Sequence, residues 1–394
     1  MRYTGWVGLL GLLALSGTGC AAEEPRDNQG PTPYAKWSAG PGHDASYFPI
    51  AVWLQSPHNA KRYQAVGINL YIGLWEGPTA EQLAALKAAG MKVICEQNAV
   101  ALADANRDII VGWMHGDEPD NAQPLPDGKG YGPPVDPARI VADYQRIRTA
   151  DPTRPVLLNL GQGVAWDGWY GRGVRTNHPE DYPKYAKGGD ILSFDIYPVV
   201  HDHADIRGKL EWVPRGVDRL RSYSQDGQVV WNCIECTRIG NKDVKPTPAQ
   251  VRSEVWLSLI HGSRGIIYFS HQFAPSFIEA GMLADDAMAK AIAAVNAQIT
   301  ELAPVLNSPT LSDAVKVSSD HAEVPVDTLV KRAGDTTYLF AGAARAGSTK
   351  ATFKLAAAGA KEAVVLGEQR KLAVTNGSFS DDFADYGVHL YAIR

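Results

Sequence analysis

The sequence predicts an α/β protein, a (β/α)₈ TIM barrel over residues 47–307 followed by a small C-terminal antiparallel β-sandwich domain over residues 308–394. Three observations predict this fold. Eight short, continuously apolar runs recur along the first three-quarters of the chain, segments with helical periodicity separate them, and after residue 308 apolar and polar residues alternate. A chain of 394 residues has room for one large barrel and a further domain.

The eight apolar runs have the length and continuity of parallel strands that are covered on both faces. They span residues 48–55, 68–75, 91–97, 109–114, 155–160, 190–197, 229–235 and 264–270. Eight strand–helix units in order, over roughly 260 residues, are typical of a closed (β/α)₈ barrel.

Four of the intervening helices carry recognisable signals. The segment 79–89 begins after a Thr cap and ends before Gly90, and the segments 136–149 and 247–262 open with Asp-Pro and Thr-Pro. The segment 285–306 has an apolar stripe at helical spacing. The helices after the first and third strands are expected to be short. In the C-terminal domain, Gly334-Asp335 and Asn376-Gly377 predict hairpin turns, and we assign this domain no chemistry.

The N-terminus has the pattern of an export signal over residues 1–20. Arg2 precedes an apolar stretch, residues 5–15, that is too short to span a bilayer, and small residues lead to Cys20. This segment resembles the lipobox of bacterial lipoproteins, which implies lipidation of Cys20 and an exported protein at the bacterial cell envelope, in contact with the membrane only through its lipid. Ordinary signal-peptide cleavage is the alternative. Residues 21–46, rich in Pro, Gly, Asn and Asp, predict a flexible tether.

Composition narrows the class of partner. Hydrophobic residues make up 45% of the chain and charged residues 21%, as in globular proteins. The net charge is −5 and no long basic run occurs, so we do not expect nucleic acid as a partner. Cys95 and Cys233 lie in apolar runs and are interpreted as core residues. Cys233 and Cys236 have CxxC spacing without a second ligand pair, so we expect no metal there and no cofactor. The sequence does not predict the oligomeric state.

Chemistry is expected at the carboxyl ends of the strands, where TIM barrels carry their active sites. The fourth run leads into Asp117-Glu118-Pro119 and the seventh ends at Glu235. Polar residues also mark the ends of the third, fifth and sixth runs: Glu96, Asn159, Asp195 and Tyr197.

Two of these side chains have the type that cleaves glycosidic bonds, in which one carboxylic acid protonates the leaving oxygen and a second carboxylate acts as nucleophile or base. Alternation places Trp231, Cys233 and Glu235 on one face of the seventh strand. We therefore predict that Glu118 and Glu235 face each other across the barrel mouth. A purely structural role is the alternative for each, with Asp-Glu-Pro capping the next helix and Glu235 an exposed loop residue.

With these motifs the sequence resembles glycoside hydrolase clan A. The resemblance implies a retaining (β/α)₈-barrel glycosidase with Glu118 as acid/base and Glu235 as nucleophile. It implies that Tyr197 hydrogen-bonds the nucleophile and that Asp117 stands where the family has an Asn contacting the sugar 2-hydroxyl. Where the family ends its eighth strand with Trp, this chain has YFSHQF, so Phe269, His271 or Phe273 would take that place.

The remaining candidates are substrate contacts. Aromatic faces stack on sugars, so Trp166, Trp169 and Tyr170 after the fifth strand are candidates, with local packing as the alternative. Trp53 and Trp75 either line the pocket floor or belong to the barrel core. Glu96 and Asp195 are expected to bind sugar hydroxyls or to position a neighbour. The tract His201-Asp202-His203 is interpreted as a solvated loop and not as a metal site.

The leading hypothesis is a secreted retaining glycoside hydrolase that cleaves β-linked glycosides or polysaccharides by a two-glutamate double displacement. The first alternative is a non-catalytic, cell-surface glycan-binding lipoprotein on the same scaffold, in which one glutamate is buried or misaimed while aromatic side chains stay exposed. The second is a metal-assisted lyase or racemase, which needs carboxylates on adjacent strands and a Lys or His base.

Overall fold

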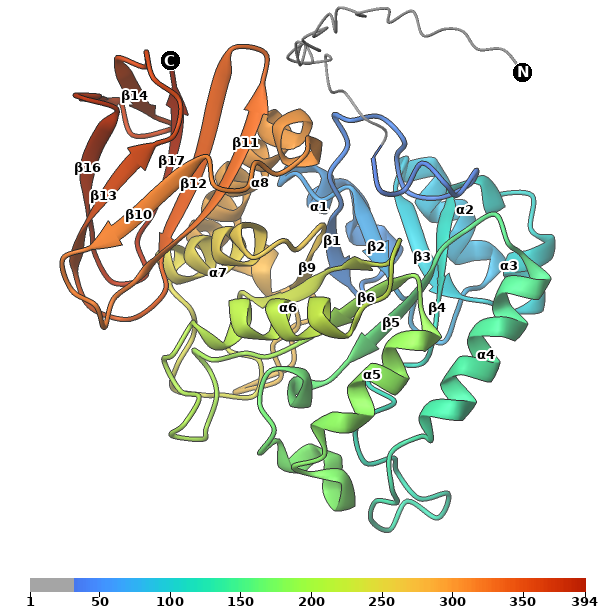
Figure 1. Ribbon diagram of the computed structural model, residues 1–394. Helices are drawn as coiled ribbons and strands as arrows, with labels where there is room; N and C mark the ends of the chain where they lie inside the picture. Colours follow the sequence, from blue (N-terminus) through green and yellow to red (C-terminus); the bar gives the residue numbers. More distant parts are fainter. Residues whose placement is uncertain (1–31) are drawn as a thin grey trace, which may run out of the picture.

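A computed structural model describes residues 32–394. Parallel strands form one barrel sheet in the order β7-β6-β5-β4-β3-β2-β1-β9-β8 (Figure 1). The strands are β1 (Ile50–Trp53), β2 (Leu70–Ile72), β3 (Lys92–Glu96), β4 (Ile110–Met114), β5 (Val156–Leu160), β6 (Ile191–Phe194), β7 (Val229–Val230), β8 (Asn232–Glu235) and β9 (Ile266–Phe269). β7 pairs with β6 and β8 pairs with β9, so the predicted seventh strand, interrupted at Trp231, closes the barrel. The predicted (β/α)₈ barrel is confirmed.

A helix follows each strand of the barrel. The helices are α1 (Ala60–Ala65), α2 (Ala80–Ala89), α3 (Ala99–Ala103), α4 (Pro137–Ala150), α5 (Tyr182–Tyr185), α6 (Trp212–Tyr223), α7 (Pro248–Ile260) and α8 (Asp286–Asn307). Thr79 and Thr247 form capping boxes with Gln82 and Gln250 at the starts of α2 and α7. The expected end signals therefore act as helix caps, and the helices after the first and third strands are short.

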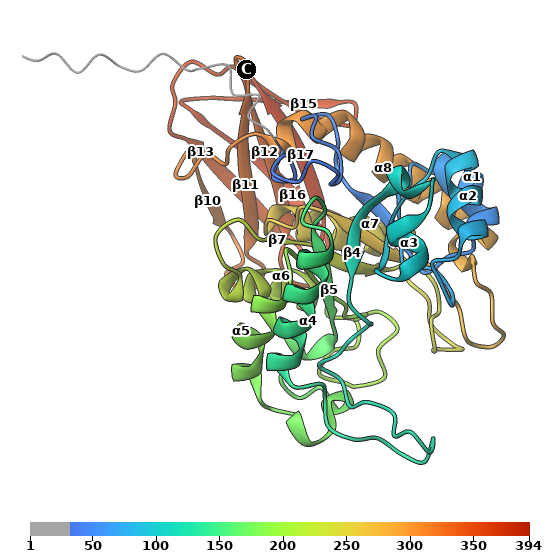
Figure 2. The same cartoon turned by 90° about the vertical axis from the view of Figure 1, so that its right-hand side faces the viewer.

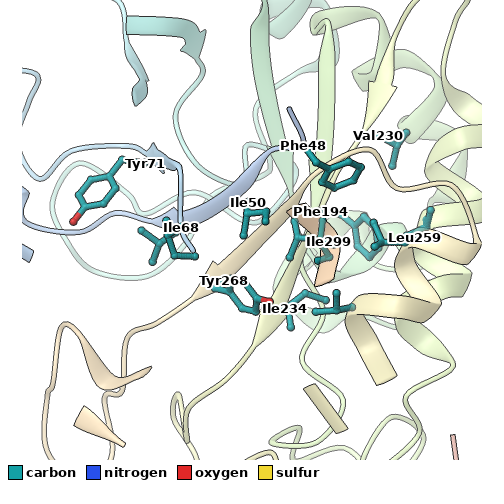
Figure 3. Packing of buried hydrophobic residues seen from close by; sticks show 14 of the residues in the cluster. Phe48, Ile50, Ile68, Tyr71, Phe194, Val230, Ile234, Leu259, Tyr268 and Ile299 are labelled. Atoms are coloured by element: carbon teal, nitrogen blue, oxygen red, sulfur yellow. The ribbon is translucent and has the colours of Figure 1, made fainter. Parts of the chain in front are cut away.

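Two apolar layers hold the barrel together. One lies inside it, where Ala51, Ile72, Leu157, Ile191 and Ile267 point inward from their strands. The other lies between strands and helices (Figure 3), where Ile50, Ile234 and Tyr268 pack with Leu259 of α7 and Ile299 of α8. The alternation of these two sets along each strand decides which residues reach the barrel mouth.

The C-terminal region forms two antiparallel sheets, as predicted, beside α7 and α8 (Figures 1 and 2). One contains β10 (Val315–Ser319), β13 (Thr349–Leu355) and β16 (Ser378–Phe383). The other contains β11 (Val326–Ala333), β12 (Thr336–Ala343), β17 (Val388–Ile393), β14 (Glu362–Val365) and β15 (Arg370–Ala373). Phe353, Phe379 and Tyr391 pack between the sheets, and Phe340 stacks on Trp256 of α7. The sandwich therefore shares a core with the barrel.

The predicted tether needs a correction from residue 32 onward. Tyr34 and Trp37 are buried in the apolar layer inside the barrel. The Tyr34 hydroxyl donates to the Arg264 carbonyl at 2.7 Å and accepts from Trp231 Nε1 at 2.8 Å. Residues at the starts of β8 and β9 make these contacts, so this segment packs against the end of the barrel opposite the mouth. Composition indicated a linker because Pro and Gly dominate, but two aromatic side chains are enough to anchor it.

The predicted signal segment, the lipidation site at Cys20 and residues 21–31 of the tether lie outside the described residues. Between residues 32 and 394, no helix is long and apolar enough to cross a membrane.

Candidate active site at the barrel mouth

Three carboxyl groups meet at the carboxyl ends of neighbouring strands, and we call Asp117, Glu118 and Asp195 the carboxyl cluster. Asp117 and Glu118 follow β4 and Asp195 follows β6. From β5 between them, Asn159 Nδ2 donates to Asp117 Oδ1 at 2.9 Å. The Asp195 carboxyl lies close enough to the Glu118 carboxyl for the two groups to influence each other's pKa.

Burial, with a smaller contribution from neighbouring carboxyl groups, governs the protonation of this cluster. Burial and the neighbouring Asp195 raise the pKa of Glu118 well above its usual range. Burial raises the pKa of Asp195 to about 6. Desolvation by the surrounding protein and the charge of Asp195 also raise the pKa of Asp117, although the side chain of Asp117 is open to solvent. The cluster therefore keeps a proton near neutral pH, and Glu118 is its holder.

The Glu118 side chain is held by a relay that the sequence analysis missed. Asn121 Nδ2 donates to Glu118 Oε2 at 2.7 Å, and Trp169 Nε1 donates to Asn121 Oδ1 at 2.9 Å. The tight turn that brings Asn121 back also places Glu118 at a φ of 41°, where non-glycine residues are uncommon. A Cβ at Gly161 would lie 3.0 Å from Glu118 Oε1 and 2.9 Å from the Asn121 amide, so only glycine fits there without displacement. The sequence signal that could have indicated this relay is the position of Asn121 three residues after Glu118.

Asp120 fixes the same loop from below. This residue is fully buried, and its carboxyl accepts from the Gly161 N–H at 2.8 Å and from the Tyr182 hydroxyl at 3.0 Å. The loop that carries Asp117 and Glu118 is thereby tied to the loop after β5.

Glu235 does not lie where the sequence analysis expected. Its side chain is fully buried, and its two oxygens accept from the N–H groups of Val199 at 2.6 Å and Val200 at 3.1 Å. The neighbouring carboxyl that influences its pKa is Glu254 of α7, whose own two oxygens have no hydrogen-bond partner in the described residues, and no member of the carboxyl cluster is among the causes of its shift. At the last residue of β8 the side chain turns toward the loop after β6, because two amide donors satisfy its oxygens there. It does not line the mouth opposite Glu118.

Tyr197 and Cys233 lie beneath the cluster. Tyr197 is buried beside Asp195, so it accompanies Asp195 instead of Glu235. Asp195 Oδ1 and Tyr197 Oη are buried without a partner of good hydrogen-bond geometry in the described part of the chain. Buried polar atoms without partners are costly, so both are suited to bind a hydroxyl group of a ligand.

Aromatic side chains line one side of the mouth. Trp166, Trp169 and Tyr170 lie together, with ring centroids 4.6–6.5 Å apart. Tyr170 is 56% exposed, whereas Trp166 is nearly buried. A cavity of about 580 Å³ runs from Tyr197 to Trp169 and Tyr170 and is bounded by residues 239–242. Of the three side chains singled out after the fifth strand, Trp169 and Tyr170 line this cavity, whereas Trp166 does not and packs behind them.

The tract His201-Asp202-His203 is only partly solvated, contrary to expectation. His201 is buried, its Nε2 lies 2.9 Å from Gln162 Oε1, and its Nδ1 accepts from the His203 N–H at 3.0 Å. Both of its ring nitrogens are thus engaged. No group of three potential metal ligands occurs among residues 32–394.

The opposite side of the mouth carries a second aromatic group. His271 is buried, with Phe269, Phe273 and Phe277 around it and Trp75 edge-on at 5.6 Å. Trp75 is 43% exposed, whereas Trp53 is 5% exposed and belongs to the layer inside the barrel.

Two further predictions concern single side chains. Glu96 ends β3 with its side chain exposed. Cys95 and Cys233 are buried, which confirms their interpretation as core residues, and Cys236 is likewise buried and free.

No family model matches the chain, and no curated protein matches its sequence. Solved structures share its fold. The alpha-amylase of Geobacillus thermoleovorans in complex with acarbose has a TM-score of 0.54 and 9% identity, over 89% of this chain and 98% of that one. A putative alpha-galactosidase of Bacteroides fragilis gives 0.54 and 11%, over 89% and 80%, and alpha-galactosidase I of Mortierella vinacea gives 0.53 and 10%, over 89% and 97%. The chain therefore has the fold of these barrel enzymes. At such low sequence identity, the similarity concerns the fold alone.

Proposed function

We propose that the protein is a glycosidase whose catalytic groups belong to the carboxyl cluster. The observation that carries the proposal is the cluster of Asp117, Glu118 and Asp195 at the barrel mouth, where Asn121 holds the Glu118 carboxyl and burial raises the pKa of Glu118 well above that of Asp195. Glycoside hydrolysis needs one protonated and one ionised carboxyl group, and a pair whose pKa values lie apart supplies both. Solved structures of this fold named as alpha-amylase and alpha-galactosidase support a carbohydrate substrate.

In the proposed mechanism, Glu118 donates its proton to the glycosidic oxygen while the bond to the anomeric carbon breaks. Asp195 attacks that carbon and forms a glycosyl ester. Glu118, now ionised, removes a proton from water, and the resulting hydroxide releases the sugar and restores both carboxyl groups. Retaining enzymes hold their two carboxyl groups roughly 5–5.5 Å apart and inverting enzymes roughly 6.5–9.5 Å apart. Asp195 lies close enough to raise the pKa of Glu118, which favours the shorter separation and therefore retention.

This mechanism moves the nucleophile from Glu235, the sequence-based assignment, to Asp195. Glu235 would have to break two backbone hydrogen bonds before it could reach a sugar. The resemblance to clan A supports β-linked substrates. Two structural neighbours are named as alpha-amylase and alpha-galactosidase, so the assays also include α-glycosides.

A second candidate function is glycan binding without catalysis. One observation favours it: Glu235 is buried while Trp75, Tyr170, Phe273 and Phe277 are at least two-fifths exposed. Such a protein would use the aromatic groups for contact and would leave the carboxyl cluster to bind hydroxyl groups.

The deciding experiment measures turnover of aryl α- and β-glycosides and of xylan, β-1,3-glucan, galactan, carboxymethyl cellulose and soluble starch. It compares the wild-type protein with Glu118→Gln, Asp195→Asn and Glu235→Gln, and uses the exposed helix residue Glu301→Gln as a matched control. The proposal expects loss of turnover in the first two variants only. Loss in Glu118→Gln and Glu235→Gln with Asp195→Asn active would restore the two-glutamate mechanism. Absence of turnover with intact polysaccharide binding would favour the binding protein.

We further propose that the protein is exported and anchored through lipid at Cys20. The supporting observation is the signal-like segment that ends at this cysteine. Cys20→Ala would then move the protein from the membrane fraction to the soluble fraction, and an unchanged distribution would exclude the anchor.

A further inference from the structure

Two phenylalanines project from the loop after β9 into solvent. Phe273 is 50% exposed and Phe277 is 57% exposed. The loop is a small hairpin, in which the Gln272 and Ile278 backbones exchange hydrogen bonds of 3.0 and 2.8 Å. A backbone-paired hairpin holds both rings in place, so ligand contact would cost little ordering entropy.

The rings of His271, Phe273 and Phe277 form a compact group and not a single column. Phe273, Phe277 and His271 have centroid separations of 5.7, 5.9 and 6.1 Å and interplanar angles of 15–31°. Three parallel rings in one column would place the outer two at about twice the spacing of neighbours. Nearly equal separations therefore exclude a single column, and each phenylalanine ring lies nearly parallel to His271, which is only 1% exposed.

This group is continuous with the pocket. Starting from Tyr197 beside the carboxyl cluster, ring centroids lie 5.3 Å away at Phe269, then 6.3 Å on at Phe273 and 5.7 Å on at Phe277. The Phe273 N–H donates to the carbonyl of Ile239 at 2.8 Å, and Ile239 lines the cavity that also contains Tyr197. A ligand that leaves the carboxyl cluster on this side meets the two exposed rings.

We propose that Phe273 and Phe277 form a distal binding platform for sugar residues of a polymeric substrate whose scissile bond lies at the carboxyl cluster. The inference rests on the carbohydrate-directed function proposed above. Ring faces attract the C–H face of pyranose rings without requiring charge, so the occupant is a neutral polysaccharide. A platform beyond the pocket contributes only to substrates longer than the pocket holds, so the protein acts on chains and not only on terminal sugars.

The test compares short and long substrates of the sugar that the panel identifies. For Phe273→Ala/Phe277→Ala we expect kcat/KM to fall at least about tenfold for oligosaccharides of five or more residues, mainly through KM, and to stay within about twofold for the aryl glycoside. Phe273→Tyr/Phe277→Tyr, which keeps the ring faces, should restore the wild-type length dependence. Equal losses for short and long substrates, or no loss for either, would overturn the proposal.

A binding measurement separates this inference from the catalytic proposal. In native gels containing the polysaccharides of the panel, Glu118→Gln should be retarded as strongly as the wild-type protein, and the double alanine variant should lose most of its retardation. This result would support the platform even if no turnover occurred. Unchanged retardation of the double alanine variant would overturn the platform. Vesicles of phosphatidylethanolamine and phosphatidylglycerol provide a second probe. If the wild-type protein bound them and the double alanine variant did not, the occupant would be a lipid surface and the proposal would be wrong.

Discussion

The barrel contains two groups of carboxyl side chains that look alike in protonation and differ in access. In the carboxyl cluster and in the Glu235–Glu254 pair, burial raises the pKa values of the acids, and a neighbouring carboxyl raises the pKa of Glu118 and of Glu254 further. Asp117 is nevertheless open to solvent, and Asp195 Oδ1 has no hydrogen-bond partner of good geometry in the described residues. Glu235 and Glu254 are fully buried, and both oxygens of Glu235 are engaged. Both oxygens of Glu254 also lack a hydrogen-bond partner in the described residues, so neither a raised pKa nor an unused polar atom identifies the chemistry. Access does, through the exposure of Asp117 and the cavity that reaches Tyr197.

The closed pair has a structural explanation. Val199 and Val200, whose N–H groups bind Glu235, follow Tyr197 after one proline. Glu254 lies on the face of α7 that packs against β8, where Ser258 also accepts a hydrogen bond from Asn232 at 2.9 Å. Glu235 thus connects the loop that carries Tyr197 to the strand and helix behind it. We infer that the pair positions the loop and takes no part in bond cleavage.

The largest expected effect separates the two groups by activity. Glu118→Gln removes the proton donor and should lower kcat/KM for an unactivated substrate about 10³-fold near pH 7. Glu254→Gln keeps the size and a hydrogen-bond donor beside Glu235, so its activity should stay within about threefold of wild type. Steady-state kinetics of both purified variants measures the difference. If Glu254→Gln lost as much activity as Glu118→Gln, the assignment of a structural role to the closed pair would be wrong.

The fold was predictable because every layer of the barrel repeats a local pattern. Continuous apolar strands, Thr and Asp caps and a change of periodicity near residue 308 each mark an element without reference to distant residues. The segment at Tyr34 was not predictable, because its burial depends on contacts with Trp231 and Arg264, about 200 residues away.

The candidate site was predictable in part. Strand ends identified Asp117, Glu118, Asn159 and Asp195 as site candidates, since the strands of a barrel end at the same rim, but not as one cluster. Alternation placed Glu235 on the inward face, but a long side chain at the end of a strand turns toward whichever partner satisfies it. Here the two backbone donors that satisfy it come from the loop after β6. Side-chain partners of this kind do not follow from strand periodicity.

The second prediction concerns stability against pH. Burial raises the pKa of Glu235 from about 4.5 to about 8. An acid with a raised pKa in the folded state stabilises the fold fully below its unfolded pKa and loses that contribution as the pH rises toward its folded pKa. The wild-type free energy of unfolding should therefore fall by about 4 kcal/mol from Glu235 between pH 5 and pH 9.

Urea unfolding at several pH values tests this. Glu254→Gln needs no proton to pair with Glu235, so its free energy of unfolding should decline less steeply, while Glu301→Gln should follow the wild type. A Glu254→Gln protein with the wild-type slope would contradict the influence of Glu254 on the pKa of Glu235.

A smaller effect is expected at Asn121, which holds the Glu118 carboxyl in the open cluster. Asn121→Ala should lower kcat/KM about tenfold through loss of orientation. Loss of an N–H donor to the carboxylate disfavours the ionised form, so the pKa of Glu118 should rise further and the alkaline limb of the pH–rate profile should move to higher pH. A purely structural defect would lower the rate without moving that limb.

The smallest effect tests whether the aromatic group and the acid are connected. Trp169→Phe keeps a ring in the wall but removes the Nε1 donor to Asn121, so kcat/KM should fall about threefold, in line with the loss of one hydrogen bond. In Asn121→Ala the same substitution should have almost no further effect, because the relay is already broken. Additive losses in the double variant would mean that Trp169 contributes only its ring to the site, and the open cluster would then depend on Asn121 alone for the orientation of Glu118.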